Sequence, residues 1–299
     1  MSQIVFKAPP VDYLENGKRT HDHLIQDKAG FEVLAELVKQ LTGIFLPNNE
    51  KNRTLMAGRV HHLLQKYELK TYSELAAKLQ GNYSKELRES FISSLTTNTT
   101  HFFREAAHYD VLKDYLKERL QDRLFTTNSF RVWCSASSSG QEPYSMLMTL
   151  LENGLPIDRQ KLEFLATDID LDILRKASAG TYSEEEVKAL SPEMKQTYFQ
   201  SRKSQTNVPL FQVLPEYRKM INFARYNLIQ DKPAFKDKFD VIFCRNVLIY
   251  FEKEVSTSVI DMLISQLKPG GLLFLGHVET GLLKNKNVRA ISHAVYKKV

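Results

Sequence analysis

The spacing of apolar residues divides the chain into two parts that meet near residue 96. Over 26–95, apolar side chains recur every three or four positions, as they do on one face of a helix. Gly43 follows the first periodic run at the position of a left-handed C-cap, and Thr71 with Glu74 has the pattern of a capping box. We therefore predict a small all-α domain of four helices over 26–95, preceded by a flexible lead-in over 1–25.

Over 96–299, apolar runs of strand length alternate with amphipathic helices. Strands of this kind, buried on both faces, form a mostly parallel sheet that is covered by helices. The strands are expected at 130–136, 161–169, 221–228, 240–248, 272–278 and 293–299. Since the last two are joined too tightly for a helical crossover, we expect them to pair antiparallel at the sheet edge.

Residues of about 192–222 interrupt this alternation. Two short apolar runs flank the polar loop RKSQTNV, which predicts a small antiparallel hairpin. The predicted fold class is therefore α/β: a Rossmann-like domain with an inserted small antiparallel β-subdomain, preceded by an all-α N-terminal domain.

Charge and cysteine content narrow the function classes only slightly. The 299 residues include 41 Lys and Arg against 35 Asp and Glu, and a net charge of +6 suits an acidic partner without identifying it. No apolar run is long enough to span a bilayer and no signal-peptide core is visible, so we expect a cytoplasmic protein. Cys134 and Cys244 end neighbouring strands and are interpreted as buried thiols, with a redox pair as the alternative. No metal site is predicted, because His61 and His62 are adjacent rather than on one helix face.

The candidate ligand-binding residues lie at the carboxyl ends of the predicted strands. The small-residue turn from Cys134 to Gly140 follows the first strand and would let a ligand approach the backbone and the next helix N-terminus. Asp168 ends the second strand, where a carboxylate can bind ribose hydroxyls, although a helix cap is an alternative role. Further polar residues, Asn227-Leu228 and Arg245-Asn246, end two more strands. Together they predict a nucleoside ligand at this edge.

Five ordered motifs carry a resemblance to a known family. They are TTNTTHFFRE, SASSSGQEPYS, ATDID, CRNVLIYF and LKPGGLLFLGH, and they run from residue 96 to 277. The chain resembles the chemotaxis receptor methyltransferases, the CheR family. The resemblance implies transfer of a methyl group from S-adenosylmethionine to glutamate carboxylates of chemoreceptors, with S-adenosylhomocysteine as product. GHVETG departs from the usual GHSES of that family.

The resemblance also assigns roles to individual residues. Arg104 and Tyr250 would be catalytic, and Arg104 would lie near the methionyl carboxylate. Cofactor contacts are implied for Asn98, Thr100, Arg104, Glu142, Asp168, Asn227, Leu228, Arg245 and Asn246. On the second helix, Lys51, Arg59, His62 and Lys66 fall on one basic arc that Leu55 interrupts. A solvated charged face is the alternative interpretation, and the resemblance implies that the arc docks the receptor's methylation helices.

Partners and alternatives complete the sequence-based expectation. The partners would be the cytoplasmic helices of methyl-accepting chemoreceptors and a receptor C-terminal peptide, with no nucleic acid and with membrane contact only through receptors. We expect a monomer. Two other functions are weighed: an adaptor that binds S-adenosylmethionine without transfer, and an RNA methyltransferase, which the positive charge would suit.

Overall fold

The computed structural model describes residues 22–81, 85–121, 129–155 and 162–299. These residues form two compact units. The N-terminal unit contains the described residues up to Thr97 together with the later segment Ile249–Val255. The second unit contains Asn98–Leu248 and Ser256–Val299. Within the described ranges, no helix combines the length and apolar character that a bilayer crossing requires.

The N-terminal unit is helical, as predicted. Its helices are α1 (Asp22–Gln26), α2 (Lys28–Thr42), α3 (Glu50–Lys66), α4 (Tyr72–Gln80) and α5 (Lys85–Leu95). Gly43 ends α2 in the left-handed conformation, and its N–H donates to the carbonyl of Lys39. The capping box of Thr71 and Glu74 opens α4. The short helix α1 was not expected: it falls at the end of the predicted lead-in, where Leu24 is buried in the helical core.

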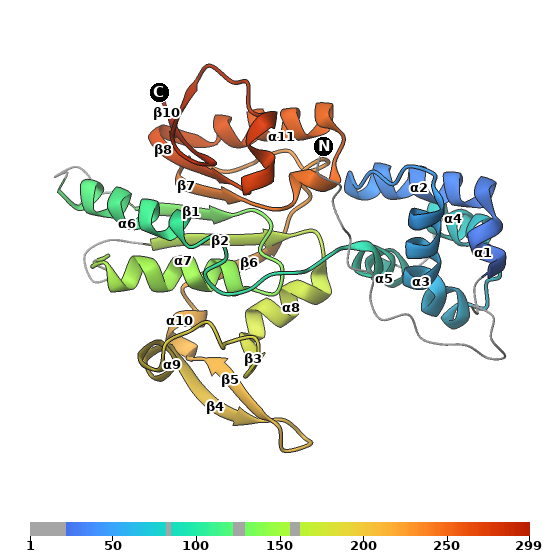
Figure 1. Cartoon of the computed structure of the whole chain (residues 1–299), viewed down its shortest axis with the longest axis horizontal. Helices are drawn as coiled ribbons and strands as arrows, with labels where there is room; N and C mark the ends of the chain where they lie inside the picture. The colour runs from blue at the N-terminus through green and yellow to red at the C-terminus, as the bar shows by residue number, and fades with distance from the viewer. Residues whose placement is uncertain (1–21, 82–84, 122–128, 156–161) are drawn as a thin grey trace. The chain divides into compact units, whose positions relative to one another are not determined.

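The second unit is built on a seven-stranded sheet in the order β6-β2-β1-β7-β8-β10-β9. The first five strands of that order are mutually parallel, which confirms the predicted sheet. Figure 1 shows α6 and α7 side by side along the sheet, and the two helices are in contact. The main elements are α6 (Ala107–Leu120), β1 (Phe130–Cys134), α7 (Gln141–Glu152), β2 (Leu162–Asp168), α8 (Leu171–Ala179), β6 (Ile221–Arg225), β7 (Phe239–Cys244), α11 (Lys253–Ser265), β8 (Leu267–Leu275), η3 (His277–Leu282), β9 (Val288–Ser292) and β10 (Val295–Lys298). The short helix η2 (Leu248–Tyr250) and the start of α11 fall largely in the segment Ile249–Val255, which belongs to the N-terminal unit.

The C-terminal strands differ from the prediction in two respects. The strand expected at 272–278 is β8, which begins at Leu267 and ends at Leu275, because the Pro269-Gly270 region lies inside the strand as a register irregularity opposite β7. β10 does pair antiparallel with β8, but it is not the edge strand. The edge is β9, whose mostly exposed residues gave no apolar strand signal.

The inserted β-subdomain is a second, three-stranded sheet in the order β3-β5-β4. The predicted hairpin is formed by β4 (Phe199–Lys203) and β5 (Pro209–Val213), which are antiparallel. The third strand, β3 (Thr181–Ser183), was missed because three residues cannot show a period. The helices α9 (Pro192–Tyr198) and α10 (Pro215–Arg218) flank the sheet.

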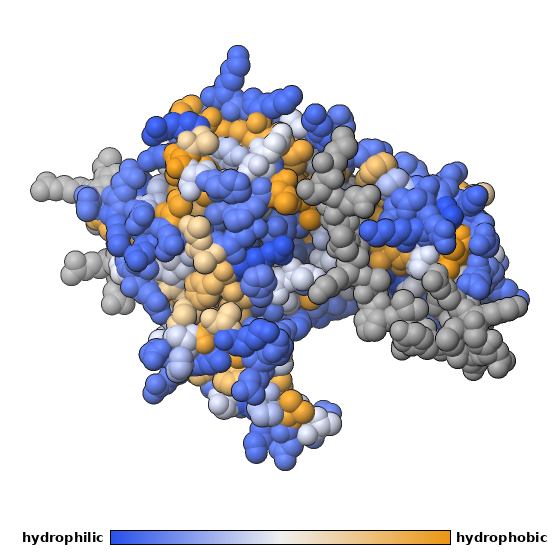
Figure 2. Space-filling model, in the orientation of Figure 1, coloured by the Kyte–Doolittle hydropathy of each residue, from blue (hydrophilic) through white to orange (hydrophobic). Residues whose placement is uncertain are grey.

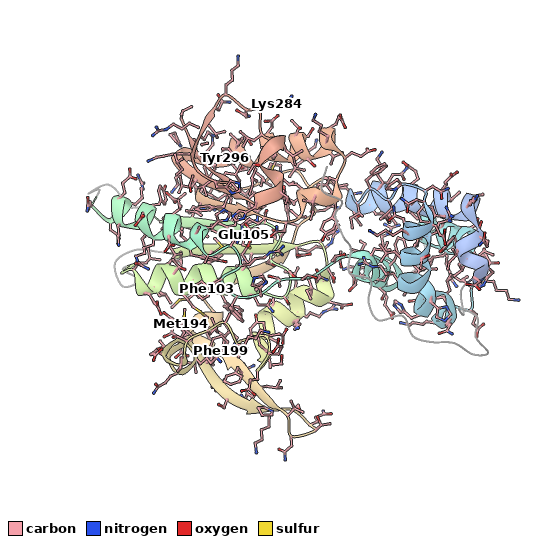
Figure 3. All side chains as sticks on the ribbon, viewed as in Figure 1. Phe103, Glu105, Met194, Phe199, Lys284 and Tyr296 are labelled. Atoms are coloured by element: carbon pink, nitrogen blue, oxygen red, sulfur yellow. The ribbon has the colours of Figure 1, made fainter. Side chains whose placement is uncertain are left out.

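Apolar side chains anchor this small sheet on the main domain. Phe199 belongs to the main hydrophobic core and Met194 packs against that core (Figure 3). Phe102, from the motif TTNTTHFFRE, contacts Tyr182 and Phe199 edge to face, with ring centroids 5.1 and 5.9 Å away. The outer end of the subdomain, at the lower edge of Figure 2, is mostly hydrophilic.

Candidate active site

The sheet order reverses at the boundary between β1 and β7. From β1 the chain passes outward through α7 to β2, whereas from β7 it passes through α11 to β8 on the other side. Such a switch point leaves a crevice at the carboxyl ends of the strands, where ligands bind in open α/β sheets. Arg245 and Asn246 directly follow β7, and Asp168 is the last residue of β2. The sheet thus brings these predicted residues to one edge.

The turn between β1 and α7 has a strained backbone and an uncapped helix start. Ser138 adopts a φ of 47° and Gly140 a φ of 96°. A side chain at Gly140 would also meet the Tyr182 hydroxyl at 2.8 Å, so the position requires glycine. Gly140 is the N-cap of α7 and supplies no side-chain acceptor, which leaves the first amides of the helix available to a ligand. Ser137 Oγ is buried and has no hydrogen-bond partner in the described parts of the chain.

Asp168 supports this turn from the end of β2. Its Oδ2 accepts a hydrogen bond from the Ser138 N–H at 2.9 Å, and its Oδ1 accepts one from the Asp170 N–H at 3.1 Å. Burial raises the pKa of Asp168 to about 6, although both amides act in the opposite direction. The cap of α8 is Asp170, which accepts from the N–H groups of Asp172 and Ile173. Asp168 therefore does not cap α8, the alternative role considered for it.

Asn98 forms hydrogen bonds with the turn between β1 and α7 and with Asp170. Its Nδ2 donates to Asp170 Oδ2 at 3.1 Å, and its carbonyl accepts from Ser138 Oγ at 3.1 Å. Thr100 follows two residues later and is partly buried. The segment that begins at Asn98 therefore runs along the strand ends of β1 and β2.

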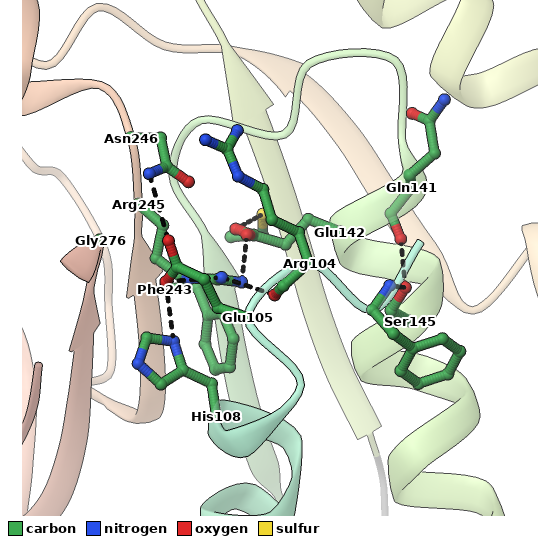
Figure 4. A network of polar contacts seen from close by, with 12 residues as sticks. Arg104, Glu105, His108, Gln141, Glu142, Ser145, Phe243, Arg245, Asn246 and Gly276 are labelled. Carbon is green, nitrogen blue, oxygen red and sulfur yellow. Dashed lines mark hydrogen bonds and ion pairs between the residues drawn. The ribbon is translucent and has the colours of Figure 1, made fainter. Parts of the chain in front are cut away.

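A buried ion-pair network lies behind the crevice (Figure 4). The Arg245 side chain is fully buried, and its Nη1 lies 2.7 Å from Glu142 Oε2. Its Nη2 lies 2.9 Å from Glu105 Oε2 and donates to the Arg104 carbonyl at 2.6 Å. Cys134 Sγ donates to the other Glu142 oxygen at 3.3 Å. The structure therefore brings Arg245 and Glu142 together as partners of one another.

The two carboxylates of this network respond differently to their surroundings. Burial raises the pKa of Glu142, and the nearby Arg245 only partly offsets that effect. Burial also acts to raise the pKa of Glu105, but Arg245, together with His277 and Asn246, outweighs burial and leaves this pKa below its ordinary value. A single guanidinium thus sits between two acids, which makes the network dependent on Arg245.

Arg104 occupies a strained stretch of backbone. The residues on either side of it, Phe103 and Glu105, both have positive φ, 53° and 58°. Backbone strain of this kind costs of the order of 1–3 kcal/mol per residue and is typical of functional sites. Arg104 Nη1 donates to the Thr99 carbonyl at 3.0 Å. Figure 4 shows its guanidinium pointing away from that of Arg245. Arg104 therefore presents a cation outside the buried network.

The loop after β7 depends on a residue that the sequence reasoning missed. Glu279 is fully buried, and its carboxylate accepts the N–H groups of Gly276 (2.6 Å), Leu248 (2.8 Å) and Asn246 (3.1 Å). Asn246 has a φ of 58°, so this carboxylate holds it in a left-handed conformation. The only available signal was the acidic residue within GHVETG, the motif that follows β8.

The remaining strand-end pair, Asn227 and Leu228, follows β6. Asn227 is buried, its N–H donates to Asp231 Oδ2 at 2.7 Å and its Oδ1 accepts from the Ile229 N–H at 3.1 Å. Leu228 is partly buried. These bonds give the loop a fixed local conformation at the same edge of the sheet.

Tyr250, the other residue expected to be catalytic, belongs to the N-terminal unit. Its carbonyl accepts the Phe45 N–H at 2.8 Å. In the same segment Glu252 forms an ion pair with Lys39 of α2 at 2.6 Å. A pocket in this unit has Tyr250 on its wall, and its full lining is Ile44, Leu46, Leu55, Met56, Arg59, Leu95, Thr97 and Tyr250. The packing of Tyr250 on this unit was not foreseen.

The predicted docking arc on α3 is only partly exposed. Lys51, His62 and Lys66 are exposed, and Lys66 lies 2.8 Å from Glu86. Arg59 instead turns inward: its guanidinium donates to the Leu95 carbonyl and to Thr97 Oγ1 at the end of α5. Burial lowers the pKa of Arg59. Of the four residues of the predicted arc, Arg59 is therefore engaged by contacts within its own unit, whereas the other three are exposed.

A parallel sheet with a switch-point crevice, an uncapped helix after β1 and an acidic residue ending β2 define the class of Rossmann-like nucleoside-binding enzymes. Two family models match the chain: the CheR methyltransferase all-alpha domain over 29–96 and the CheR methyltransferase SAM-binding domain over 98–296. The chain belongs to the CheR methyltransferase family.

Curated relatives agree with this assignment. The chain is 36% identical to the chemotaxis protein methyltransferase of Escherichia coli over 86% of each chain. It is 35% identical to that of Salmonella typhimurium, over 84% of this chain and 83% of the relative. It is 34% identical to that of Borreliella burgdorferi, over 89% of this chain and 93% of the relative. The protein is thus a methyltransferase whose cofactor is S-adenosylmethionine.

The residues at the strand ends fit that cofactor. The buried, unpartnered Ser137 Oγ and the uncapped α7 offer polar groups at the turn where an adenosine-containing ligand binds in this fold. Asp168 offers a carboxylate for hydroxyl groups, and Arg104 offers a cation for a carboxylate. Both types of group are present on S-adenosylmethionine.

Proposed function

We propose that the chain transfers a methyl group from S-adenosylmethionine to glutamate carboxylates of chemoreceptors and so forms methyl esters. The observation that carries this proposal is Arg104. Its guanidinium lies outside the buried network, and among the described residues its one hydrogen bond goes to a backbone carbonyl. A cation in this position attracts a carboxylate acceptor more readily than a neutral hydroxyl or base amine. The relatives' name, chemotaxis protein methyltransferase, supports a receptor as substrate.

The chemistry requires alignment more than acid–base catalysis. When bound, S-adenosylmethionine supplies a methyl group on a sulfonium, which a carboxylate can attack without a general base. A glutamate carboxylate is already ionised near neutral pH. The tasks left to the protein are to orient that carboxylate and to exclude water. We assign the first task to Arg104 and Tyr250, and the cofactor contacts to Asn98, Thr100, Arg104, Glu142, Asp168, Asn227, Leu228, Arg245 and Asn246.

A methyl-transfer assay tests the reaction type. Tritiated S-adenosylmethionine is incubated with the chain and receptor-containing membranes, and the labelled material is then treated with base. The proposal predicts label in the receptor that is released by base, because carboxyl methyl esters hydrolyse. Base-stable label in added RNA would identify an RNA methyltransferase, and cofactor binding without label would identify an adaptor; either result contradicts the proposal.

Tyr250 is expected to orient the acceptor. The change Tyr250→Phe removes only its hydroxyl, so we expect a clear fall in the rate of methyl transfer with unchanged affinity for S-adenosylhomocysteine. Methylation kinetics and titration calorimetry measure the two quantities. Tyr67→Phe, on the same N-terminal unit, is the matched control and should leave both unchanged. A loss of cofactor affinity in Tyr250→Phe would contradict the role.

The exposed part of the arc on α3 is expected to dock the receptor. Reversing charge with Lys51→Glu and Lys66→Glu should raise the KM for receptor several-fold and leave cofactor affinity unaltered, since oppositely charged surfaces steer association. The salt dependence should weaken in parallel. The double variant Lys117→Glu and Lys188→Glu, at two exposed lysines of the second unit, provides a control of equal charge change. Equal KM values for the α3 variant and the control would show that this surface does not dock the receptor.

Asp168 should make cofactor binding sensitive to pH. The pKa of Asp168 is raised to about 6 by burial. Hydroxyl donors bind the ionised form, so cofactor binding favours the carboxylate. The affinity for the cofactor is then highest well above pH 6 and falls as the pH drops through 6. Once the protonated form of Asp168 dominates, the affinity falls by about tenfold per pH unit. Calorimetry with S-adenosylhomocysteine between pH 5 and 8 measures this, and Asp168→Asn should flatten the profile. A wild-type profile as flat as that of the variant would contradict it.

Further partners follow from the same proposal. We place the protein in the cytoplasm as a monomer that reaches the membrane only through receptors and binds no nucleic acid. The edge strand β4 has exposed residues over 201–203 and could accept a receptor C-terminal peptide as an added strand. A pull-down with receptor C-terminal peptides tests that contact.

A further inference from the structure

Three potential metal ligands converge beside the ion-pair network. They are Glu105, which precedes α6, His108 in its first turn, and His277 at the start of η3. Glu105 Oε2 lies 3.5 Å from His108 Nδ1 and 3.5 Å from His277 Nε2. All three ligand atoms lie within 4.8 Å of one another. Ligands about 2.0–2.1 Å from a tetrahedral zinc ion lie about 3.3 Å apart. The spacing therefore suits a single small ion with little movement.

The hydrogen bonding of His108 leaves its other nitrogen without a partner. The ring is 2% exposed, and Nε2 lies 3.2 Å from the His293 carbonyl. Because a carbonyl oxygen can only accept, Nε2 carries the proton, and in the neutral ring Nδ1 is a bare lone pair. Nδ1 has no hydrogen-bond partner among the residues that the structure describes. It faces the carboxylate of Glu105, as Figure 4 shows. Two electron-rich atoms directed at each other in a buried site favour a cation between them.

We propose that Glu105, His108 and His277 form a binding site for a divalent transition metal of the Zn²⁺ type. Two imidazoles and one carboxylate are a donor set that zinc uses, and three protein ligands leave a fourth position open. The supporting contacts of such a site are also present. Metal-binding histidines donate their second N–H to a carbonyl, as His108 does to His293.

Arg245 limits the strength of this site. Its Nη2 lies 2.9 Å from the same Glu105 oxygen and would remain as an outer partner of the ligating carboxylate. The two positive charges repel each other, so binding is weaker than at a zinc site built from thiolates. The alternative to a metal ion in this site is a proton shared between Glu105 and a histidine. Metal addition distinguishes the two because a proton-bridged pair shows no stoichiometric uptake of metal.

The test is metal titration of the untagged full-length chain after treatment with a chelator. Calorimetry with Zn²⁺ should give one ion per chain, and Co²⁺ should give the visible d–d bands of a four-coordinate site. His277→Ala should weaken binding by more than the roughly 10–100-fold that loss of an outer partner costs. Since the His277 side chain is 43% exposed, this variant should fold, which circular dichroism and a thermal melt verify. His277→Gln is the second variant and should behave in the same way.

His62→Ala is the matched control, because His62 is an exposed histidine on α3. It should retain the stoichiometry, the Co²⁺ bands and the affinity of the wild-type chain. Failure of the wild-type chain to bind either metal would overturn the proposal. So would equal affinity in the wild-type and His277 variants, or a loss of binding in His62→Ala. The readout is metal uptake alone, so its outcome is independent of methyl transfer.

Discussion

Replacing Arg245 by methionine is expected to lower the free energy of unfolding by about 3–5 kcal/mol. The Arg245 side chain is fully buried between two carboxylates: its Nη1 lies 2.7 Å from Glu142 Oε2, and its Nη2 lies 2.9 Å from Glu105 Oε2. Methionine fills similar space but leaves two carboxylates close together without their cation. The cost arises from those uncompensated charges rather than from lost packing volume. Urea unfolding followed by circular dichroism measures the change as a shift of the midpoint.

Two further variants show whether the charges are responsible. Adding Glu142→Gln to Arg245→Met should restore part of the stability, because it removes one unpaired carboxylate from a shared network. Lys188→Met removes an exposed lysine that pairs with Glu185, and it should change stability by no more than about 0.5 kcal/mol. If Arg245→Met proves no more destabilising than Lys188→Met, the network does not hold the fold together.

Replacing Arg104 by alanine is expected to weaken binding of S-adenosylhomocysteine by roughly 10–100-fold. This corresponds to the loss of a hydrogen bond between charged groups, about 1.5–3 kcal/mol. Stability should change little, because the Arg104 side chain lies outside the buried network and its one hydrogen bond in the described chain goes to the Thr99 carbonyl. Titration calorimetry measures the affinity, and a thermal melt measures the stability.

The controls for Arg104 separate charge from geometry. Arg104→Lys keeps the charge but loses the planar fork, so its affinity should lie between those of the wild type and the alanine variant. Arg175→Ala removes an exposed arginine on α8 that pairs with Asp172, and its affinity should match the wild type. Unchanged affinity in Arg104→Ala would remove this residue from the cofactor site.

Local sequence patterns were sufficient to predict the framework of the fold. Apolar runs marked the five parallel strands, and Gly43 and Thr71 marked helix ends, because each of these signals lies within a few residues of the feature it predicts. Asp168 could be placed at the edge of the sheet for the same reason: it directly ends an apolar run. Short or exposed strands such as β3 and β9 carry no such signal and were missed.

Contacts that depend on tertiary arrangement could not be predicted in this way. Glu105, Glu142 and Arg245 are more than thirty residues apart in the chain, and only the strand order brings them into one network. The sequence allowed Glu142 and Arg245 to be proposed as ligand-binding residues, but it did not allow their ion pair with one another to be predicted. Glu279 was missed because one acidic residue after a strand has many alternative roles. The positive φ angles of Phe103 and Glu105 could not be predicted either, because neither position is a glycine.

The segment Ile249–Val255 shows that the domain boundaries in the sequence differ from the compact units of the structure. A chain that began at Asn98 would keep Tyr250, yet it would lack the Phe45 amide that binds the Tyr250 carbonyl and the Lys39 ammonium that pairs with Glu252. The excised fragment would thus contain a segment that had lost both of these contacts. An expression boundary placed at residue 98 would therefore cut through one of the two compact units rather than between them.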